Sequence, residues 1–228
     1  MREVCETYRA APKRLKTEGI HTICVDEKTG MQALEPKAPT QPMRPGRPER
    51  REFEYARHGT QTLIGNFEVA TGELIAPTVQ QTRGEVDFAK HIETTIATDP
   101  KAGWIFVADN LNTHCSATLV LLIAGLCLIP AETLGEKGKS GVLQSVATRK
   151  SFLMDTGHRV RFVYVPKHTS WLNQIEIWFS ILGRRVIRRG VFRSKAELRD
   201  RVLRFIEYYN RTMAKPFKWT YAGRPLNV

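Results

Sequence analysis

Two short apolar runs that each lead to an aspartate constrain the fold of this chain more than any other feature. Residues 21–26, HTICVD, end at Asp26, and residues 103–108, GWIFVA, are followed by Asp109. Short runs rich in β-branched and aromatic side chains predict buried β-strands. The sequence therefore predicts two core strands with an acidic side chain at the end of each.

The residues around these strands predict further strands and a helix. Turn residues at 28–30, followed by an extended piece at 31–34, predict a hairpin directly after Asp26. Residues 59–79 predict two more strands joined by a tight turn, Ala70-Thr71-Gly72. Apolar residues at helical spacing predict a helix over 85–98. We thus expect three antiparallel strands, a crossover helix and a central strand.

The second half of the chain combines regular elements with a poorly patterned segment. Ser116 is a suitable N-cap for a buried helix through residue 126. Residues 130–158 are polar and glycine-rich without a clear period, so we expect an insertion or mobile flap. Three elements complete the order: a strand at 161–165, a helix at 171–187 that carries Glu176, and a helix that starts with a Ser194/Glu197 capping box.

This order of elements predicts an α/β fold with a mixed sheet. Three antiparallel strands precede parallel strands, helices flank the sheet, and an insertion stands before the last strand, which is a ribonuclease H-like arrangement. We expect a lead-in or linker over residues 1–20, the ribonuclease H-like domain over 21–190, and a C-terminal helix and tail over 191–228 that pack on the core.

The charge balance favours a polyanionic partner. Lys and Arg number 35 against 23 Asp and Glu, a formal net charge of +12, and such a surface attracts nucleic acid. Residues 36–51 hold five of the twelve prolines and predict an exposed extended loop, either a DNA-contacting arm or a solvated spacer. Its basic side chains are Arg44, Arg47, Arg50 and Arg51.

A second basic group follows Glu176 on the same predicted helix. Like charges at i, i+4 repel, and no acidic residue stands between 177 and 195 to offset them, so we expect DNA phosphate to contact these side chains. They are Arg184, Arg185, Arg188 and Arg189.

The cysteines and the length of the apolar runs indicate the cellular compartment of the protein. The four cysteines form no C-x-x-C pair and mostly lie in apolar runs, which suits reduced, buried thiols and gives no zinc pattern. The longest apolar run, 119–129, is shorter than the roughly 20 residues that a membrane span needs. Without a secretory signal pattern at residues 1–10, we expect a cytoplasmic, nucleoid-associated protein with no membrane partner.

Three acids distant in sequence could form a metal site. In a ribonuclease H-like arrangement Asp26, Asp109 and Glu176 can converge, and carboxylate oxygens suit Mg²⁺ or Mn²⁺. Two such ions about 3.5–4 Å apart can clamp a phosphodiester for in-line displacement. The alternative reading makes the two aspartates strand-end residues that cap backbone groups, and Glu176 a solvent-exposed helix residue.

Three stretches carry a family resemblance: CVDEKTGMQAL, VADNLNTHCS and YVPKHTSWLNQIEIWFSIL. With residues 44–74 they make most of residues 20–190 similar to the DDE catalytic domain of bacterial mariner-superfamily insertion-sequence transposases. The resemblance implies that Asp26, Asp109 and Glu176 are catalytic residues that hold two Mg²⁺ or Mn²⁺ ions. It also implies cleavage of double-stranded DNA at element ends and strand transfer into target DNA.

The sequence departs from this family pattern in two places. Asp109 and Glu176 are 67 positions apart, which is longer than usual, and the insertion at 130–158 accounts for the excess. The helix-turn-helix region that usually precedes the catalytic core has no counterpart in the few residues before Asp26. We expect a separate or fused helix-turn-helix region to recognise the element ends, and a homodimer in the DNA complex by analogy.

Several polar residues near the acids are candidates for supporting roles. Four of them could orient a metal-bound water, contact the substrate or steady a carboxylate, although the asparagines after Asp109 could equally hydrogen-bond the turn. These candidates are Asn110, Asn112, His114 and Asn173. The aromatic side chains that flank Glu176, Trp171, Trp178 and Phe179, are expected to be core anchors.

Three functions therefore stand at this point. The first is a DNA transposase core that hydrolyses phosphodiesters and transfers strands. The second is a catalytically inactive DNA-binding remnant, which the insertion and the missing N-terminal region suggest. The third is another ribonuclease H-like nuclease, against which the WLNQIEIWF stretch argues.

Overall fold

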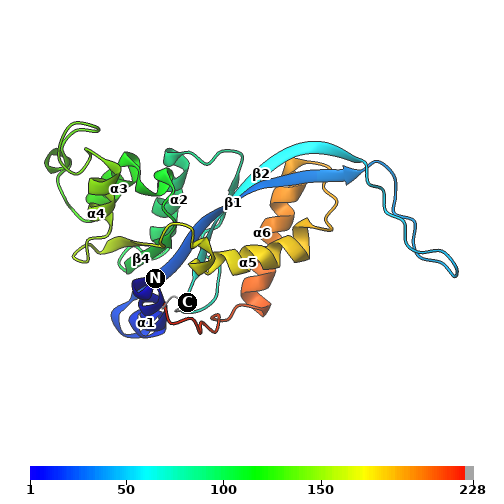
Figure 1. The fold of residues 1–228 in the computed structure, drawn as a ribbon, viewed down its shortest axis with the longest axis horizontal. Helices are drawn as coiled ribbons and strands as arrows, with labels where there is room; N and C mark the ends of the chain where they lie inside the picture. Colours follow the sequence, from blue (N-terminus) through cyan, green and yellow to red (C-terminus); the bar gives the residue numbers. More distant parts are fainter. Residues whose placement is uncertain (224–228) are drawn as a thin grey trace, which may run out of the picture.

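A five-stranded mixed sheet forms the centre of the molecule (Figure 1). The computed structural model describes residues 1–223. The strands lie in the order β3-β2-β1-β4-β5, with β1–β2 and β2–β3 antiparallel and β1–β4 and β4–β5 parallel. This topology confirms the predicted ribonuclease H-like sheet. The strands are β1 (Ile20–Pro36), β2 (Tyr55–Glu68), β3 (Thr78–Gln80), β4 (Gly103–Ala108) and β5 (Val160–Tyr164).

Helices cover both faces of the sheet. The helices are α1 (Arg2–Glu18), α2 (Glu85–Ile96), α3 (Ala117–Leu126), α4 (Val146–Leu153), α5 (Ile175–Leu182) and α6 (Lys195–Thr212). Side chains alternate along β1, so that Cys24 packs with α1, α5 and α6, whereas Ile23 and Val25 pack with α2, α3 and α4. The sheet therefore has two separate cores, one on each face.

The N-terminal segment differs from its prediction as a lead-in or linker. Helix α1 runs through Pro12 to Glu18, well past the short helical piece expected near its start. Val4, Tyr8 and Ala11 are buried against the sheet, and the Tyr8 hydroxyl donates to the Leu172 carbonyl at 2.8 Å. The apolar face at i, i+4 and i+7 therefore makes this segment part of the core despite its basic, proline-containing sequence.

The prediction of a hairpin at residues 28–30 is wrong. Strand β1 continues through these residues, and its register with β2 shifts between Lys28 and Met31. Gly30 has φ +65°, a conformation that suits glycine, and it takes up the extra residue as a bulge. The chain reverses instead beyond Pro36, so that the three antiparallel strands are β1, β2 and β3. The Ala70–Gly72 turn is present, with the Gly72 amide donating to the Glu68 carbonyl at 2.8 Å.

Residues 130–158, predicted as an insertion or mobile flap, form a packed subregion. They contain a short 3₁₀ turn, η2 (Ala131–Leu134), and helix α4, which Ser145 caps by accepting from the Thr148 amide. Leu134, Leu143 and Leu153 are buried in the core on the α2 side. Three widely spaced leucines give no sequence period, yet each fills a place in the core.

The helix that carries Glu176 is interrupted at both ends. A 3₁₀ turn, η3 (Ser170–Leu172), precedes α5, and a π-helical turn, η4 (Gly183–Ile187), follows it. Helix α6 begins with the predicted cap, in which the Ser194 side chain accepts from the Glu197 amide at 3.0 Å. Within residues 1–223, no helix combines the length and the apolar character needed to cross a bilayer.

Candidate functional site

Asp26 and Asp109 lie side by side at the ends of the two central strands. Strands β1 and β4 are parallel neighbours, and Cys24 is paired with Val107. Continuing this register by two residues places Asp26 opposite Asp109, on the face that α5 covers. The two strand ends therefore place Asp26 and Asp109 side by side, close enough for the charge of Asp109 to act on Asp26.

Helix α5 approaches the sheet closely beside Asp26. The cross-strand partner of Asp26 on β2 is Gly65, and a Cβ at that position would stand 2.9 Å from Ile175 Cδ1. The Asn173 side-chain amide donates to the Val25 carbonyl at 3.0 Å, and the Glu176 amide donates to the Asn173 carbonyl at 3.1 Å. The first turn of α5 is thus fixed to β1 at the residue before Asp26.

Glu176 is half-buried on that first turn, over the same face as the two aspartates. Within residues 1–223, the one cluster of three possible metal ligands within 4.8 Å of one another is Asp26, Glu27 and His114, so it contains neither Glu176 nor Asp109. The structure therefore brings the helix of Glu176 over the face of the aspartates, but Asp26, Asp109 and Glu176 do not form one cluster of ligand atoms within 4.8 Å.

A buried ion-pair chain supports Asp109 from the other face of the sheet. His114 Nδ1 lies 2.7 Å from Asp109 Oδ1, a close ion pair without the alignment of a straight hydrogen bond, and His114 Nε2 lies 3.2 Å from both Glu27 oxygens. Side chains of Asp26, Glu27 and His114 also offer donor atoms within 4.8 Å of one another. Sequence reasoning missed Glu27, although its place directly after Asp26 on a strand end was a usable signal.

The two aspartates have opposite pKa shifts. Burial raises the pKa of Asp26 to about 7, and the nearby charge of Asp109 adds to the rise. Burial also raises the pKa of Asp109, but the contact with His114 and the hydrogen bond from the Leu111 amide outweigh it and lower this pKa. Burial alone would lower the pKa of His114, yet its contacts with Asp109 and Glu27 raise it to about 10. His114 is therefore cationic at neutral pH.

The loop after Asp109 is held by the 130–158 segment. Asn110 donates to the Val165 carbonyl and accepts from the Lys150 ammonium of α4. The same ammonium lies 4.9 Å from the centre of the Tyr164 ring. Asn112 is exposed at the start of a 3₁₀ turn, η1 (Asn112–Cys115), with no contact that points to the aspartates. Of the two asparagines, only Asn110 is built into the site.

Backbone hydrogen bonds to Asp109 agree in part with the alternative reading of a strand-end cap. The Leu111 amide donates to Asp109 Oδ1 at 2.9 Å, as in an Asx turn. The same carboxylate borders a surface cleft of about 300 Å³, whose other lining residues include Lys167, His168 and Ser170. The side chain thus shapes its loop and also faces a basic cleft.

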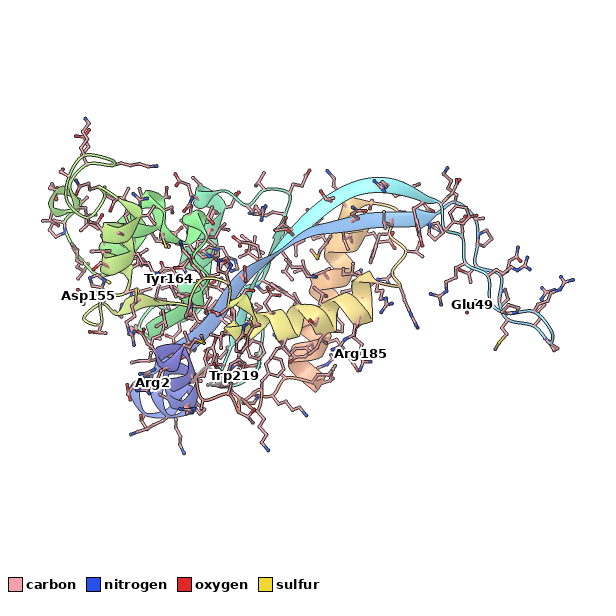
Figure 2. The ribbon with its side chains drawn as sticks, viewed as in Figure 1. Arg2, Glu49, Asp155, Tyr164, Arg185 and Trp219 are labelled. Carbon is pink, nitrogen blue, oxygen red and sulfur yellow. The ribbon has the colours of Figure 1, made fainter. Side chains whose placement is uncertain are left out.

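The predicted DNA-contacting arginines lie away from the aspartates. Figure 2 shows Glu49 on the extended loop beyond the body and Arg185 near the outer end of α5. The arginines on η4 and after it are exposed. Arg51, Arg188 and Arg189 share a groove of about 460 Å³ at the base of the loop. A second groove of about 330 Å³ lies between η4 and α6 and also contains Arg185.

The aromatic side chains around Glu176 divide into two kinds. Trp178 is fully buried and Phe179 nearly so, as expected for core anchors. Trp171 is 51% exposed and packs edge-on against Tyr221, so its prediction as a core anchor is wrong. It stands on η3, outside the regular part of the helix, where helical spacing no longer points it inward.

Acids at the ends of two central strands of such a mixed sheet define the class of ribonuclease H-like nucleases. The sequence matches the model of the DDE superfamily endonuclease family over residues 21–199, and the chain belongs to that family. A search of curated proteins found no match. The neighbouring aspartates, of which Asp26 is buried and Asp109 partly exposed, are consistent with this assignment, which rests on the sequence match.

Solved structures of the Mos1 mariner transposase are distant neighbours. Its paired-end complex with Mn has 15% sequence identity and a TM-score of 0.35, and the alignment covers 91% of this chain and 62% of that one. Its isolated catalytic domain has 12% identity and a TM-score of 0.31, with 95% of each chain covered. This chain thus spans 62% of the length of the transposase chain in the complex.

Proposed function

We propose that this chain is the catalytic core of a DNA transposase of the bacterial insertion-sequence, mariner-like type. It hydrolyses phosphodiester bonds at element ends and joins the exposed 3′-hydroxyl to target DNA. The observation that carries the proposal is the placement of Asp26 and Asp109 at neighbouring ends of the parallel strands β1 and β4, on the face that the helix of Glu176 covers, in a chain of the DDE endonuclease family.

The residues present fit divalent cations. Asp26 is 8% exposed and its pKa is raised to about 7 beside a second carboxylate, so bound cations would relieve the cost of ionising both. The donors are carboxylate oxygens, which hard cations prefer. Asp26, Asp109 and Glu176 would hold two Mg²⁺ or Mn²⁺ ions, which supply charge neutralisation at the phosphate and activation of the attacking hydroxyl.

The chain's own residues prepare this site before substrate arrives. The His114 cation holds Asp109 ionised, and Glu27 fixes the His114 ring from the opposite side. Asn173 ties the first turn of α5 to β1, which sets the position of Glu176. Lys150 orients Asn110 at the edge of the cleft beside Asp109. These contacts hold Asp109, its loop and the helix of Glu176 in place before substrate binds.

Basic side chains on one side of the molecule would follow a DNA backbone. Arg188 stands twelve residues after Glu176 and directly follows η4, on the order of 18 Å away along the helix axis. A duplex that leaves the site along α5 would meet the arginines of η4 and then the base of the extended loop. End recognition by a separate or fused helix-turn-helix region, and a homodimer in the DNA complex, complete the proposal.

Nicking of a supercoiled plasmid tests the function. Purified full chain with Mg²⁺ or Mn²⁺ is expected to convert the plasmid to open circles, and chelator is expected to stop the reaction. Asp26→Asn, Asp109→Asn and Glu176→Gln should each reduce the rate on the order of 10³-fold. The exposed Glu18→Gln on α1 is the matched control.

Each outcome has a clear meaning. Loss in all three variants supports the triad, and retained cutting in Glu176→Gln would remove Glu176 from it. Metal-independent DNA binding by folded wild-type protein without nicking would favour an inactive remnant. Preferential cutting of RNA–DNA hybrids would favour another ribonuclease H-like nuclease.

A further inference from the structure

Residues 37–54, hereafter the arm, extend from the β1–β2 ribbon away from the body (Figure 1). All of them except Glu52 are exposed. Met43 is 76% exposed and Phe53 is 83% exposed. A segment of this length that contributes nothing to either core adds little to folding, so its shape and side chains point to a partner.

The arm is an ordered hairpin. Gln41 and Arg50 exchange two backbone hydrogen bonds of 2.9 and 3.1 Å, and Arg44 and Arg47 exchange two of 3.0 and 2.8 Å. Pro45 and Gly46, with φ +77° at Gly46, fit the central positions of a type II turn between these two arginines. The arm is therefore closed by a tight turn at Arg44-Pro45-Gly46-Arg47.

Prolines stiffen this hairpin in advance. They occur at every third position from Pro36 to Pro48, and each fixes its own φ. A stiff arm loses little conformational freedom when it binds. It therefore suits insertion into a narrow site better than wrapping around a surface.

The tip presents two arginines side by side. Arg44 and Arg47 are directly opposite in the hairpin, so their side chains share one side and their charges repel. No described ion pair involves either of them, and no acidic residue stands from Gln41 to Pro48. This arrangement calls for an anionic partner that can take both guanidinium groups at once.

We propose that the arm tip enters the minor groove of A/T-rich duplex DNA, with Arg44 and Arg47 in the groove and Met43 against its wall. This inference rests on the proposed function only in taking DNA as the substrate. A/T-rich minor grooves are narrow and strongly negative, and arginine is the side chain they attract. Exposed Met and Pro beside arginine are the wedge residues of minor-groove ribbons.

Recognition of the major groove would require side chains other than those at the arm tip. A two-stranded ribbon also fits that groove, but discrimination there uses polar side chains along the face of the ribbon. The tip offers two arginines, a methionine and prolines, with Gln41 as its one amide side chain. The minor groove is therefore the better match.

Fluorescence polarisation in EDTA tests the inference without any cleavage. The full chain is titrated onto A/T-rich and G/C-rich duplexes of equal length. The wild type should prefer the A/T-rich duplex, and netropsin, which fills the minor groove, should compete. The Arg44→Ala/Arg47→Ala variant should bind the A/T-rich duplex about tenfold more weakly and lose the preference.

Two matched variants separate geometry from charge. Arg44→Lys/Arg47→Lys keeps both charges and should still lose most of the preference, because lysine lacks the planar guanidinium. Arg9→Ala/Lys13→Ala removes two exposed charges from α1 and should weaken binding to both duplexes equally. Equal affinity of the wild type for both duplexes would overturn the inference, as would an unchanged preference in the alanine variant.

A protein partner would give a different result. If the arm variants shift a monomer–dimer equilibrium in sedimentation without changing DNA affinity, the arm contacts a second copy and the inference fails. Because the titration needs no metal, its outcome is independent of plasmid nicking. Failure of the groove proposal and failure of the catalytic proposal can therefore be told apart.

Discussion

Two histidine–glutamate pairs show how differently the two halves of β1 are built. Glu27, in the inner half, lies 3.2 Å from His114, and their side chains are 2% and 0% exposed. Glu35, in the outer half, lies 3.0 Å from His58, and both side chains are 33% exposed. Residue types and distances are nearly the same, so the difference lies in the surroundings.

Burial decides what each pair can do. Water screens the outer pair, and such pairs contribute little. In the inner pair, each charge depends on its partner because neither reaches solvent. One strand thus carries a rigid, charged site at one end and leads to a solvent-exposed arm at the other. This division fits a protein whose body holds the catalytic site and whose arm contacts a long substrate.

The largest expected effect comes from breaking the inner pair. His114→Ala leaves Glu27 buried without its cation and should cost about 3–5 kcal/mol in the free energy of unfolding. His58→Ala, the matched change in the outer half, should cost no more than about 1 kcal/mol. Urea denaturation monitored by circular dichroism measures both. Equal losses would contradict the comparison.

A smaller effect is expected where α5 meets the sheet. A side chain at Gly65 would press against Ile175 and Phe179, so Gly65→Val should cost about 1–3 kcal/mol and shift α5 away from Asp26. The control is Gly125→Val on α3, where a Cβ would meet nothing within 4 Å. We expect nicking to fall in the first variant only. Full activity in Gly65→Val would show that the close approach of α5 is unnecessary.

Lys150 tests whether the 130–158 segment serves the site. Lys150→Met keeps most of the packing over Tyr164 but removes the donor to Asn110, and it should reduce nicking about 10-fold with little change in stability. Lys139→Met, which breaks only an exposed pair with Glu136, should have no effect. A drop in kcat with unchanged KM for DNA would mark a positioning role. Identical nicking rates for the two variants would show that the 130–158 segment does not contribute to the site.

The last expected effect is a change in pH dependence. The pKa of Asp26 is raised to about 7, above its unfolded value, so its favourable contribution to stability is full below pH 4 and is lost as the pH rises through 7. Without metal, stability should therefore fall between about pH 4 and 7, and Asp26→Asn should flatten this fall. The His114 contribution, with a pKa of about 10, is lost later, between about pH 6.5 and 10. The midpoint of urea denaturation, measured in EDTA at each pH, gives the pH dependence of stability. Parallel curves of midpoint against pH for the wild type and Asp26→Asn would contradict the raised pKa of Asp26.

The sequence predicted those strands and helix caps that depend only on neighbouring residues. Strand β4, the cap of α3 at Ser116 and the cap of α6 at Ser194 were predicted because each depends on neighbouring residues. The acids at strand ends could be paired because parallel neighbours end at the same edge. The course of β1 through Gly30 was missed, because a Lys-Thr-Gly sequence fits a bulge as well as a turn.

Features that depend on tertiary packing could not be predicted from the sequence. The role of Glu27 depends on His114, which is 87 positions away, and the burial of α4 depends on scattered leucines. The link between Lys150 and Asn110 spans 40 positions and two elements. The position of Glu27 directly after Asp26 was a usable signal, but the contacts themselves leave no local pattern, so only the three-dimensional structure reveals them.

Binding of Mn²⁺ to the DNA-free protein tests the central claim most directly, since the aspartate pair is proposed to hold the catalytic cations. Titration calorimetry at pH 7.5 should show binding to the wild type, and none at comparable concentration to Asp26→Asn or Asp109→Asn. Folding of both variants is checked by circular dichroism. Unchanged Mn²⁺ binding in these folded variants would contradict the account.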